Sequence, residues 1–278
     1  MKEIYDNYAL NASKMVTRSY STSFHSGVQC LDKSIRNDVH SIYGFVRLAD
    51  EIVDSFHGYD QASLLDEFKK NTFAALDHGI SLNPILNSFQ AAVNKYEIDH
   101  ELIHQFLHSM EMDLNSLEYT QAKYEEYILG SAEVVGLMCL KIFVYGDEAE
   151  YQRLKPFAMK LGSAFQKINF LRDMNADYYE LGRIYFPGID VHNMTPEDKQ
   201  QIEAEIHDEF REAFIGIQQL PKSSRFGVYV SYVYYSKLLR KIKRKTMQEL
   251  ISSRIRIPNN TKWFLFAKSY VRNSMNML

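Results

Sequence analysis

The chain of 278 residues is long enough to bury a large core, and its composition favours helices. It contains 12 glycines and 6 prolines, too few breakers for a collagen-like, linker-rich or many-turned β protein. A formal net charge of −3 disfavours nucleic acid as a partner. Cys30 and Cys139 are too few for a disulfide framework, which indicates a reducing, cytoplasmic compartment.

Neither a signal peptide nor a membrane span is expected. The first six residues already carry several charges, where a signal peptide needs an apolar core of about 7–15 residues. The most apolar stretch, 134–144, contains Lys141 and falls short of the roughly 18 apolar residues that cross a bilayer. Any membrane contact is therefore expected to be peripheral.

Apolar residues recur every three or four positions along nearly the whole chain, which predicts one all-α domain over residues 1–278. The predicted helices span about 3–18, 37–56, 61–78, 84–94, 100–117, 123–144, 150–179, 197–219, 225–252 and 260–274. Asn83-Pro84 and Thr195-Pro196 supply helix starts. The segment 181–188, with two glycines and a proline, predicts an ordered loop, either a lid or a connector packed on the core.

One predicted helix carries a pair of carboxylates on a single face. Asp50 and Asp54 lie four residues apart, and Arg47 lies one turn before them. Like charges at this spacing cost about 0.2–0.5 kcal/mol, so the pair needs either solvent or a cation. A solvated helix face is the more common explanation for such a pair on its own.

A second pair belongs to a longer polar stripe. Gln166, Asn169, Asp173 and Asp177 share one helix face beside Arg172, and the other faces are largely apolar. A buried stripe with two carboxylates is costly unless the carboxylates are paired or bind metal. Oxygen ligands favour Mg²⁺, which often binds substrate phosphates as well. The two pairs together predict Mg²⁺ held against a diphosphate that leaves an apolar substrate.

A di-metal carboxylate bundle is the alternative that composition allows. That fold uses Glu-x-x-His pairs, and none accompanies these aspartates. The basic run near the C-terminus also has two interpretations, a solvated helix face or attraction to an anionic membrane surface. This run comprises Lys237, Arg240, Lys241, Lys243, Arg244 and Lys245.

Three segments resemble the squalene/phytoene synthase family of head-to-head prenyl transferases, and most of all its bacterial phytoene synthases. They are Ser-Thr-Ser-Phe at 21–24, Ile-Tyr-Gly-Phe-Val-Arg-Leu-Ala-Asp-Glu-Ile-Val-Asp at 42–54, and 166–187, which ends in Gly-Arg-Ile-Tyr-Phe-Pro. They occur in the family's order and spacing, and the resemblance covers about residues 10–270. It implies an all-α isoprenoid-synthase fold, with helices around a central active-site cavity.

The resemblance also implies a site. Asp50, Asp54, Asn169, Asp173 and Asp177 would hold Mg²⁺, or Mn²⁺ in its place, against two prenyl diphosphates. The matching substrate-contacting positions are Ser21, Ser23, Tyr43, Arg47, Gln166, Arg172, Tyr235 and Arg254. Among them Tyr43, Arg47 and Tyr235 are the expected catalytic residues, with Tyr234 as an alternative to Tyr235.

The implied reaction joins two geranylgeranyl diphosphates through a cyclopropyl diphosphate to give phytoene, a step of carotenoid biosynthesis. The alternatives are condensation of farnesyl diphosphate to squalene, with NADPH, or to dehydrosqualene, and a scaffold protein that has lost catalysis. One position departs from the family, because Leu129 replaces a usual tyrosine. Tyr127 points roughly 200° away from it around a helix, and Glu133 falls one turn after it. The sequence does not identify a protein partner.

Overall fold

The computed structural model describes residues 1–115, 119–179, 183, 185–188, 194–252 and 254–274. Over these residues the chain folds into helices and contains no strand, which confirms the all-α prediction. None of the helices in the described part of the chain is long and apolar enough to cross a membrane.

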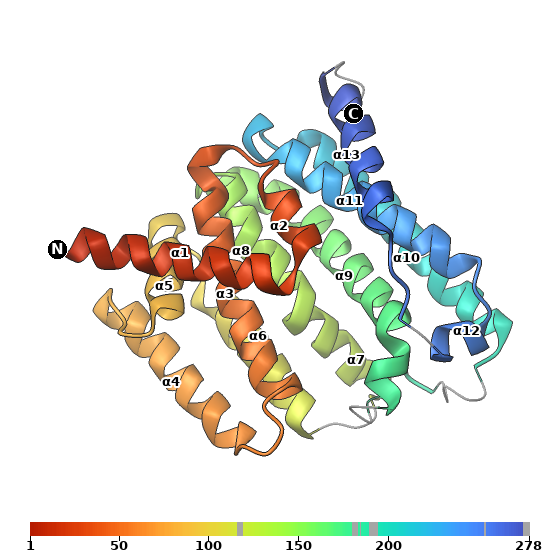
Figure 1. The fold of residues 1–278 in the computed structure, drawn as a ribbon, viewed down its shortest axis with the longest axis horizontal. Coiled ribbons are helices and arrows are strands. Elements are labelled where there is room, and N and C mark those ends of the chain that lie inside the picture. The colour runs from red at the N-terminus through yellow and green to blue at the C-terminus, as the bar shows by residue number, and fades with distance from the viewer. Residues whose placement is uncertain (116–118, 180–182, 184, 189–193, 253, 275–278) are drawn as a thin grey trace.

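The helices follow one another closely along the chain (Figure 1). The first half consists of α1 (Lys2–Tyr20), α2 (Thr22–Val28), α3 (Lys33–Asp54), α4 (Gln61–His78), α5 (Pro84–Tyr96), α6 (His100–Asn115), α7 (Gln121–Ile128), a π-helical turn (Leu129–Glu133) and α8 (Val134–Phe143). The second half consists of α9 (Glu148–Tyr179), α10 (Pro196–Gln219), α11 (Lys222–Lys243), α12 (Met247–Ser252) and α13 (Asn259–Ser274).

Side-chain caps set several of the helix starts. The Asn83 carboxamide oxygen accepts from the backbone N–H groups of Ile85 and Leu86, with Pro84 in the first turn. Thr195 and Asp198 form a reciprocal capping box at the start of α10. Both helix starts predicted from sequence are therefore confirmed, and their caps satisfy backbone donors that have no partner within the helix.

Two of the predicted helices differ from the observed ones, and one observed helix was not predicted. The short helix α2 was not predicted, and it begins because Ser21 accepts from the Phe24 N–H and separates it from α1. The single helix predicted over 225–252 is two helices, α11 and α12. The break occurs at Thr246, whose hydroxyl accepts from the Glu249 N–H while the Glu249 carboxylate accepts from the Thr246 N–H, at 3.3 and 2.8 Å.

The helix predicted over 123–144 is continuous but contains the π-helical turn. The Val134 N–H bonds the Leu129 carbonyl, five residues back, instead of the usual four. The turn packs closely between α6 and α9. A Cβ on Gly130 would lie 2.6 Å from the Gln105 carbonyl oxygen, and one on Gly162 would lie 2.8 Å from the Ala132 carbonyl oxygen. Glycine at both positions therefore allows this close approach.

The buried apolar side chains form two clusters. The first packs α3, α5, α6 and α8 around Phe45, Phe89 and Phe106. The second packs α7, the middle of α9, α10 and the end of α11, and it includes Tyr185 and Phe186. Figure 1 places α9 between the helices of the first cluster and those of the second, α10 and α11. The aspartates singled out in the sequence lie on α3, which packs in the first cluster, and on α9, which packs in the second.

Candidate active site

The first carboxylate pair occupies the last turns of α3. The Arg47 guanidinium forms ion pairs with Asp50 and with Glu51, and it lies 4.6 Å from the centre of the Tyr20 ring. The Asp50 side chain is 33% exposed, whereas that of Glu51 is 10% exposed. Arg47 is therefore shared between a partly buried carboxylate and one that is nearly buried. Burial, followed by repulsion from Asp54, raises the pKa of Asp50 to about 7, and Arg47 lowers it.

Asp54 ends α3 and meets an arginine from the loop after α9. Arg183 Nη1 lies 2.6 Å from Asp54 Oδ1, and Arg183 Nη2 donates to the Val53 carbonyl at 3.3 Å. The Arg183 side chain is only 6% exposed. Tyr185 and Phe186 of the same loop are buried in the second cluster. Of the two interpretations given for this loop, its described residues match the connector packed on the core.

Behind Arg183 lies a fully buried carboxylate that belongs to α6. Asp113 Oδ1 is 3.8 Å from Arg183 Nη1, and its two oxygens accept from three tyrosine hydroxyls. The donors are Tyr127 at 2.8 Å, Tyr119 at 3.2 Å and Tyr185 at 3.3 Å. Burial raises the pKa of Asp113 to about 6, while Arg183 and the hydroxyl donors lower it.

The second carboxylate motif lies on α9. Asp173 accepts from the Arg172 Nε at 2.9 and 3.0 Å, and Arg254 Nε lies 2.7 Å from Asp173 Oδ1. Asn169, one turn earlier, donates to the Gln166 side chain at 3.3 Å. Asp173 is thus held by two arginines, one from its own helix and one from the segment after α12.

Two tyrosines connect the motifs of α3 and α9. Tyr235 of α11 donates to Asn169 Oδ1 at 3.2 Å and stacks on Phe165 with ring centres 3.9 Å apart. Burial raises the pKa of Tyr43 to about 12, Arg47 and the Ser21 hydroxyl lower it, and Asp50 and Tyr235 raise it further. Tyr43 therefore lies within electrostatic reach of groups on both sides, and Tyr235 contacts Asn169 of α9.

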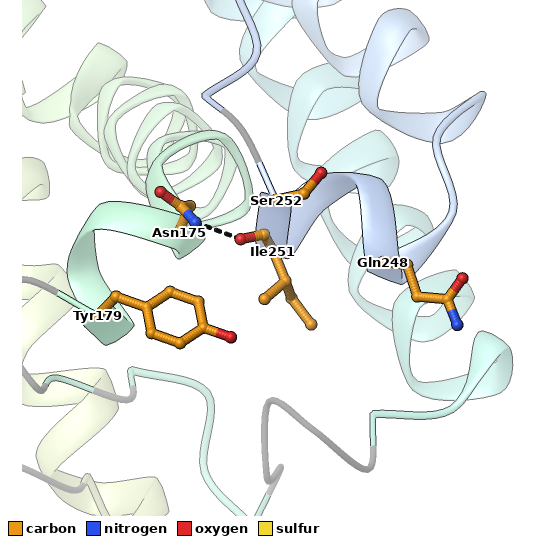
Figure 2. Close-up of a pocket in the computed structure, with 5 residues that line it drawn as sticks. All are labelled: Asn175, Tyr179, Gln248, Ile251 and Ser252. Carbon is orange, nitrogen blue, oxygen red and sulfur yellow. Dashed lines mark hydrogen bonds between the residues drawn. The ribbon is translucent and has the colours of Figure 1, made fainter.

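Arg254 reaches Asp173 because α12 is attached to the last turns of α9. Asn175 donates through its amide to the Ile251 carbonyl oxygen (Figure 2). The same two residues line a pocket with Tyr179, Gln248 and Ser252. The segment that follows α12 then carries Arg254 to Asp173.

The structure brings most of the predicted site residues together, but not as a preassembled metal centre. Ser21 caps α2, and Ser23 is half-buried in the first turn of that helix. Asp177 lies in α9, and its side chain is outside the described part of the structure. Among the described residues no three His, Cys, Asp or Glu side chains are grouped closely enough to hold a metal ion.

The donors nevertheless fit a divalent cation accompanied by an anion. Asp50 and Asp54 repel one another, which a cation between them would relieve. Arg172 and Arg254 both pair with the Asp173 carboxylate. Phosphate oxygens are acceptors of the same kind and would bind the two arginines in its place. Within the described residues the Arg47 Nε–H is buried without an acceptor, as expected of a donor that meets a ligand oxygen.

The departure at Leu129 has a structural context. Leu129 begins the π-helical turn and packs against the first apolar cluster. Tyr127 does not replace the missing tyrosine, because its hydroxyl is bound to Asp113. Glu133 lies beside charges of α9 and α10: burial and then Glu209 raise its pKa to about 7.

Sequence reasoning missed Glu51, Arg183 and Asp113 as parts of the site. For Asp113 a signal existed, because it lies seven residues after Phe106 and three after Met110, on the apolar stripe of α6. A carboxylate at such a position is buried and needs partners. The tyrosines that supply them come from other segments, which the spacing within one helix cannot show.

Among known proteins, the chain is similar in sequence to phytoene synthases. It is 26% identical over 249 residues to phytoene synthase 1 of Solanum lycopersicum, covering 82% of this chain and 59% of that protein. It is also 26% identical over 187 residues to 15-cis-phytoene synthase of Paracoccus sp., covering 64% of this chain and 60% of that protein. The chain thus spans about three fifths of the length of these relatives.

Solved structures share the fold. A dehydrosqualene synthase in complex with ligand superposes with a TM-score of 0.84 at 18% identity, over 97% of this chain and 98% of that one. A squalene synthase of Alicyclobacillus acidocaldarius superposes with a TM-score of 0.74 at 20% identity, over 87% and 95% of the two chains. The predicted all-α isoprenoid-synthase fold is therefore confirmed.

The family model described as squalene/phytoene synthase matches residues 17–261. This range contains both aspartate motifs, the arginines that pair with them and the tyrosines between them. On that match, the chain belongs to the squalene/phytoene synthase family.

Proposed function

We propose that the protein is a Mg²⁺-dependent prenyl transferase that condenses two prenyl diphosphates head to head. The observation that carries the proposal is the pairing of carboxylates with arginines on both α3 and α9. Loss of diphosphate from an allylic carbon builds negative charge on the leaving group. Fixed cations at that position stabilise the transition state more than the ground state.

In this proposal the carboxylates, arginines and aromatic rings of the site have different roles. Asp50 and Asp54 would hold Mg²⁺, which would supply charge neutralisation at the leaving diphosphate. Arg47 and Arg254 bind diphosphate oxygens, Arg47 through its buried Nε–H. The ring of Tyr235, stacked on Phe165, offers a π face to the carbocation that remains when the diphosphate leaves.

We propose geranylgeranyl diphosphate as the substrate and phytoene as the product, through a cyclopropyl diphosphate. The sequence relatives support this choice, because they are named phytoene synthases. Squalene and dehydrosqualene synthases share the fold, and their reactions on farnesyl diphosphate are the alternative outcomes of the test.

The test is product analysis with purified protein. The protein is incubated with Mg²⁺ and either geranylgeranyl or farnesyl diphosphate, with and without NADPH, and the extracted hydrocarbons are analysed by mass spectrometry. We expect a forty-carbon product from geranylgeranyl diphosphate, and none after addition of EDTA. A thirty-carbon product alone would replace phytoene by squalene or dehydrosqualene, and no product from either substrate would favour a scaffold protein.

We further propose a cytoplasmic location with peripheral contact to an anionic membrane. Lys243 and Arg244 at the end of α11 are exposed, which supports such contact. Two other cations of the basic run are engaged internally, Lys241 with the Arg256 carbonyl and Lys245 with Glu249, each at 2.6 Å. Flotation with anionic and neutral vesicles tests this: we expect binding only to anionic vesicles, and its loss in K243E/R244E.

A further inference from the structure

The buried carboxylate of Asp113 is surrounded by a closed group of tyrosines. The rings of Tyr119, Tyr127 and Tyr185 lie 5.1–5.2 Å apart, centre to centre, in all three pairs. Their hydroxyls all donate to Asp113. Phe170 of α9 stacks on Tyr185 with ring centres 4.1 Å apart and ring planes 13° apart. This tyrosine cage therefore joins α6, α7, the loop after α9 and α9 itself.

The carboxylate inside the tyrosine cage also pairs with an arginine. A carboxylate with 3% exposure is costly to bury, and its hydroxyl donors favour the ionised form. The buried guanidinium of Arg183 lies 3.8 Å from Asp113 and also reaches Asp54. Arg183 is therefore shared between a caged carboxylate and a candidate metal ligand that is 30% exposed.

Because Arg183 pairs with both Asp113 and Asp54, Asp113 affects how strongly Arg183 competes with a metal ion for Asp54. Arg183 contacts Oδ1 of Asp54, which leaves Oδ2 of the same carboxylate to a ligand. Without Asp113, the buried guanidinium would depend on Asp54 alone for its counter-charge, and a metal ion would have to displace it. A second carboxylate behind the arginine reduces that dependence.

The other aspartate of the pair has a matching arrangement. Arg47 lies between Asp50 and Glu51, and Glu51 is nearly buried, as Asp113 is. In both cases the arginine that pairs with the aspartate also pairs with a second carboxylate, which is almost inaccessible to solvent. The repetition indicates that the balance serves the two partly exposed aspartates, Asp50 and Asp54.

We propose that Asp113 is a positioning residue, which through Arg183 keeps Asp54 available to a divalent cation. The inference rests on the proposed function of Asp54 as a metal ligand. Asp113 itself contacts neither metal nor substrate in this account.

The test measures Mn²⁺ binding in the presence of inorganic diphosphate, by the EPR signal of free Mn²⁺. Asp113→Asn keeps the shape of the side chain and removes its charge, and Tyr127→Phe removes one donor to it. We expect the Mn²⁺ dissociation constant to rise about tenfold in Asp113→Asn and about threefold in Tyr127→Phe. The matched control is Glu203→Gln, because Glu203 of α10 is also buried and ion-paired, with Lys199.

A double-mutant cycle tests the route through Arg183. In an Arg183→Met background, Asp113→Asn should no longer change the Mn²⁺ dissociation constant, because no buried guanidinium is left to balance. In steady-state assays, Asp113→Asn should raise the half-saturating Mg²⁺ concentration and leave kcat at saturating Mg²⁺ near that of the wild type. A merely structural defect would lower kcat at every Mg²⁺ concentration.

Two results would overturn the inference: an Mn²⁺ dissociation constant in Asp113→Asn equal to that of Glu203→Gln, or a tenfold effect that persists in the Arg183→Met background. The Mn²⁺ measurement does not require turnover. If the wild type makes phytoene and Asp113→Asn leaves the Mn²⁺ affinity unchanged, then the inference about Asp113 is wrong and the proposed function stands. If the protein has no prenyl transferase activity but its Mn²⁺ affinity depends on Asp113, then the proposed function is wrong and the inference about Asp113 stands.

Discussion

Glu133 is a residue whose charge works against folding. It lies near Glu209, which accepts from Ser163 at 2.8 Å and from Lys167 at 2.9 Å. Burial and Glu209 raise the pKa of Glu133 to about 7, and Lys160 and Lys167 lower it without cancelling the rise. At neutral pH and above, the folded protein therefore holds an ionised group that the unfolded chain would solvate better.

The stability of the protein should consequently fall as the pH rises through this range. Between about pH 4.5 and 7 the folded state binds more protons at Glu133 than the unfolded state, so the free energy of unfolding decreases with pH. We expect Glu133→Gln to be more stable than the wild type at pH 8, by about 1 kcal/mol, and equal to it near pH 4.5. Urea unfolding at the two pH values measures the difference.

The control for this prediction is Glu67→Gln, at an exposed position of α4. It should leave the free energy of unfolding unchanged at both pH values. If Glu133→Gln behaves like Glu67→Gln at pH 8, then Glu133 ionises at its ordinary pKa and carries no such cost.

At the level of elements, the short helix α12 determines where Arg254 lies. Six residues are too few for a helix to be stable alone, so its position depends on contacts with other elements. Leu250 is buried in the second cluster, and the Ile251 carbonyl accepts from Asn175 of α9. Figure 2 shows this bond at the pocket between α9 and α12. Asn175 thereby fixes the segment whose arginine contacts Asp173.

We predict that Asn175→Ala weakens diphosphate binding without unfolding the protein. Loss of the bond to Ile251 lets α12 move, and Arg254 then spends less time at the site. The KM for the prenyl diphosphate should rise about five- to tenfold with a smaller change in kcat, since one charge-assisted contact contributes about 1.5–3 kcal/mol at most.

Gln248→Ala is the control, because Gln248 lines the same pocket and is exposed on α12. It should leave KM near the value of the wild type. Equal KM values in the two variants would show that Asn175 does not place Arg254.

For the whole molecule, the site joins two separately packed halves. Asp50, Asp54 and Arg47 belong to α3, which packs in the first apolar cluster, whereas Asn169, Asp173 and Arg254 are attached to the second. A ligand that contacts both sets of residues stabilises the folded chain, because only the folded state holds the two sets at a fixed position relative to each other.

We therefore predict that Mg²⁺ with inorganic diphosphate raises the Tm by about 5 °C at saturating concentration, and that either one alone raises it less. Asp50→Asn should abolish both this rise and turnover. At pH 8 it should also increase the Tm of the metal-free protein by about 2 °C, because the raised pKa of Asp50 means that its ionised form disfavours folding.

Differential scanning calorimetry measures the Tm values, and the product assay with prenyl diphosphate measures turnover. Asp66→Asn serves as the control, since Asp66 is an exposed residue of α4 paired with Lys70. An undiminished rise in Asp50→Asn would exclude Asp50 as a ligand for metal or metal-bound diphosphate.

The sequence by itself determined the fold class, most helix boundaries and the aspartate motifs. Period and spacing suffice for these features, because each lies within one helix: Asp50 and Asp54 share a face wherever α3 is placed. The family resemblance added the substrate class, and the match over residues 17–261 confirmed the family.

Only the tertiary structure decided which partner each charged residue has. Arg183 pairs with Asp54 across 129 positions of the chain, and Tyr185 bonds Asp113 across 72. It also divided the helix predicted over 225–252 at Thr246. Such pairings depend on how helices pack against one another, and the periodicity of a single helix contains no information about its neighbours.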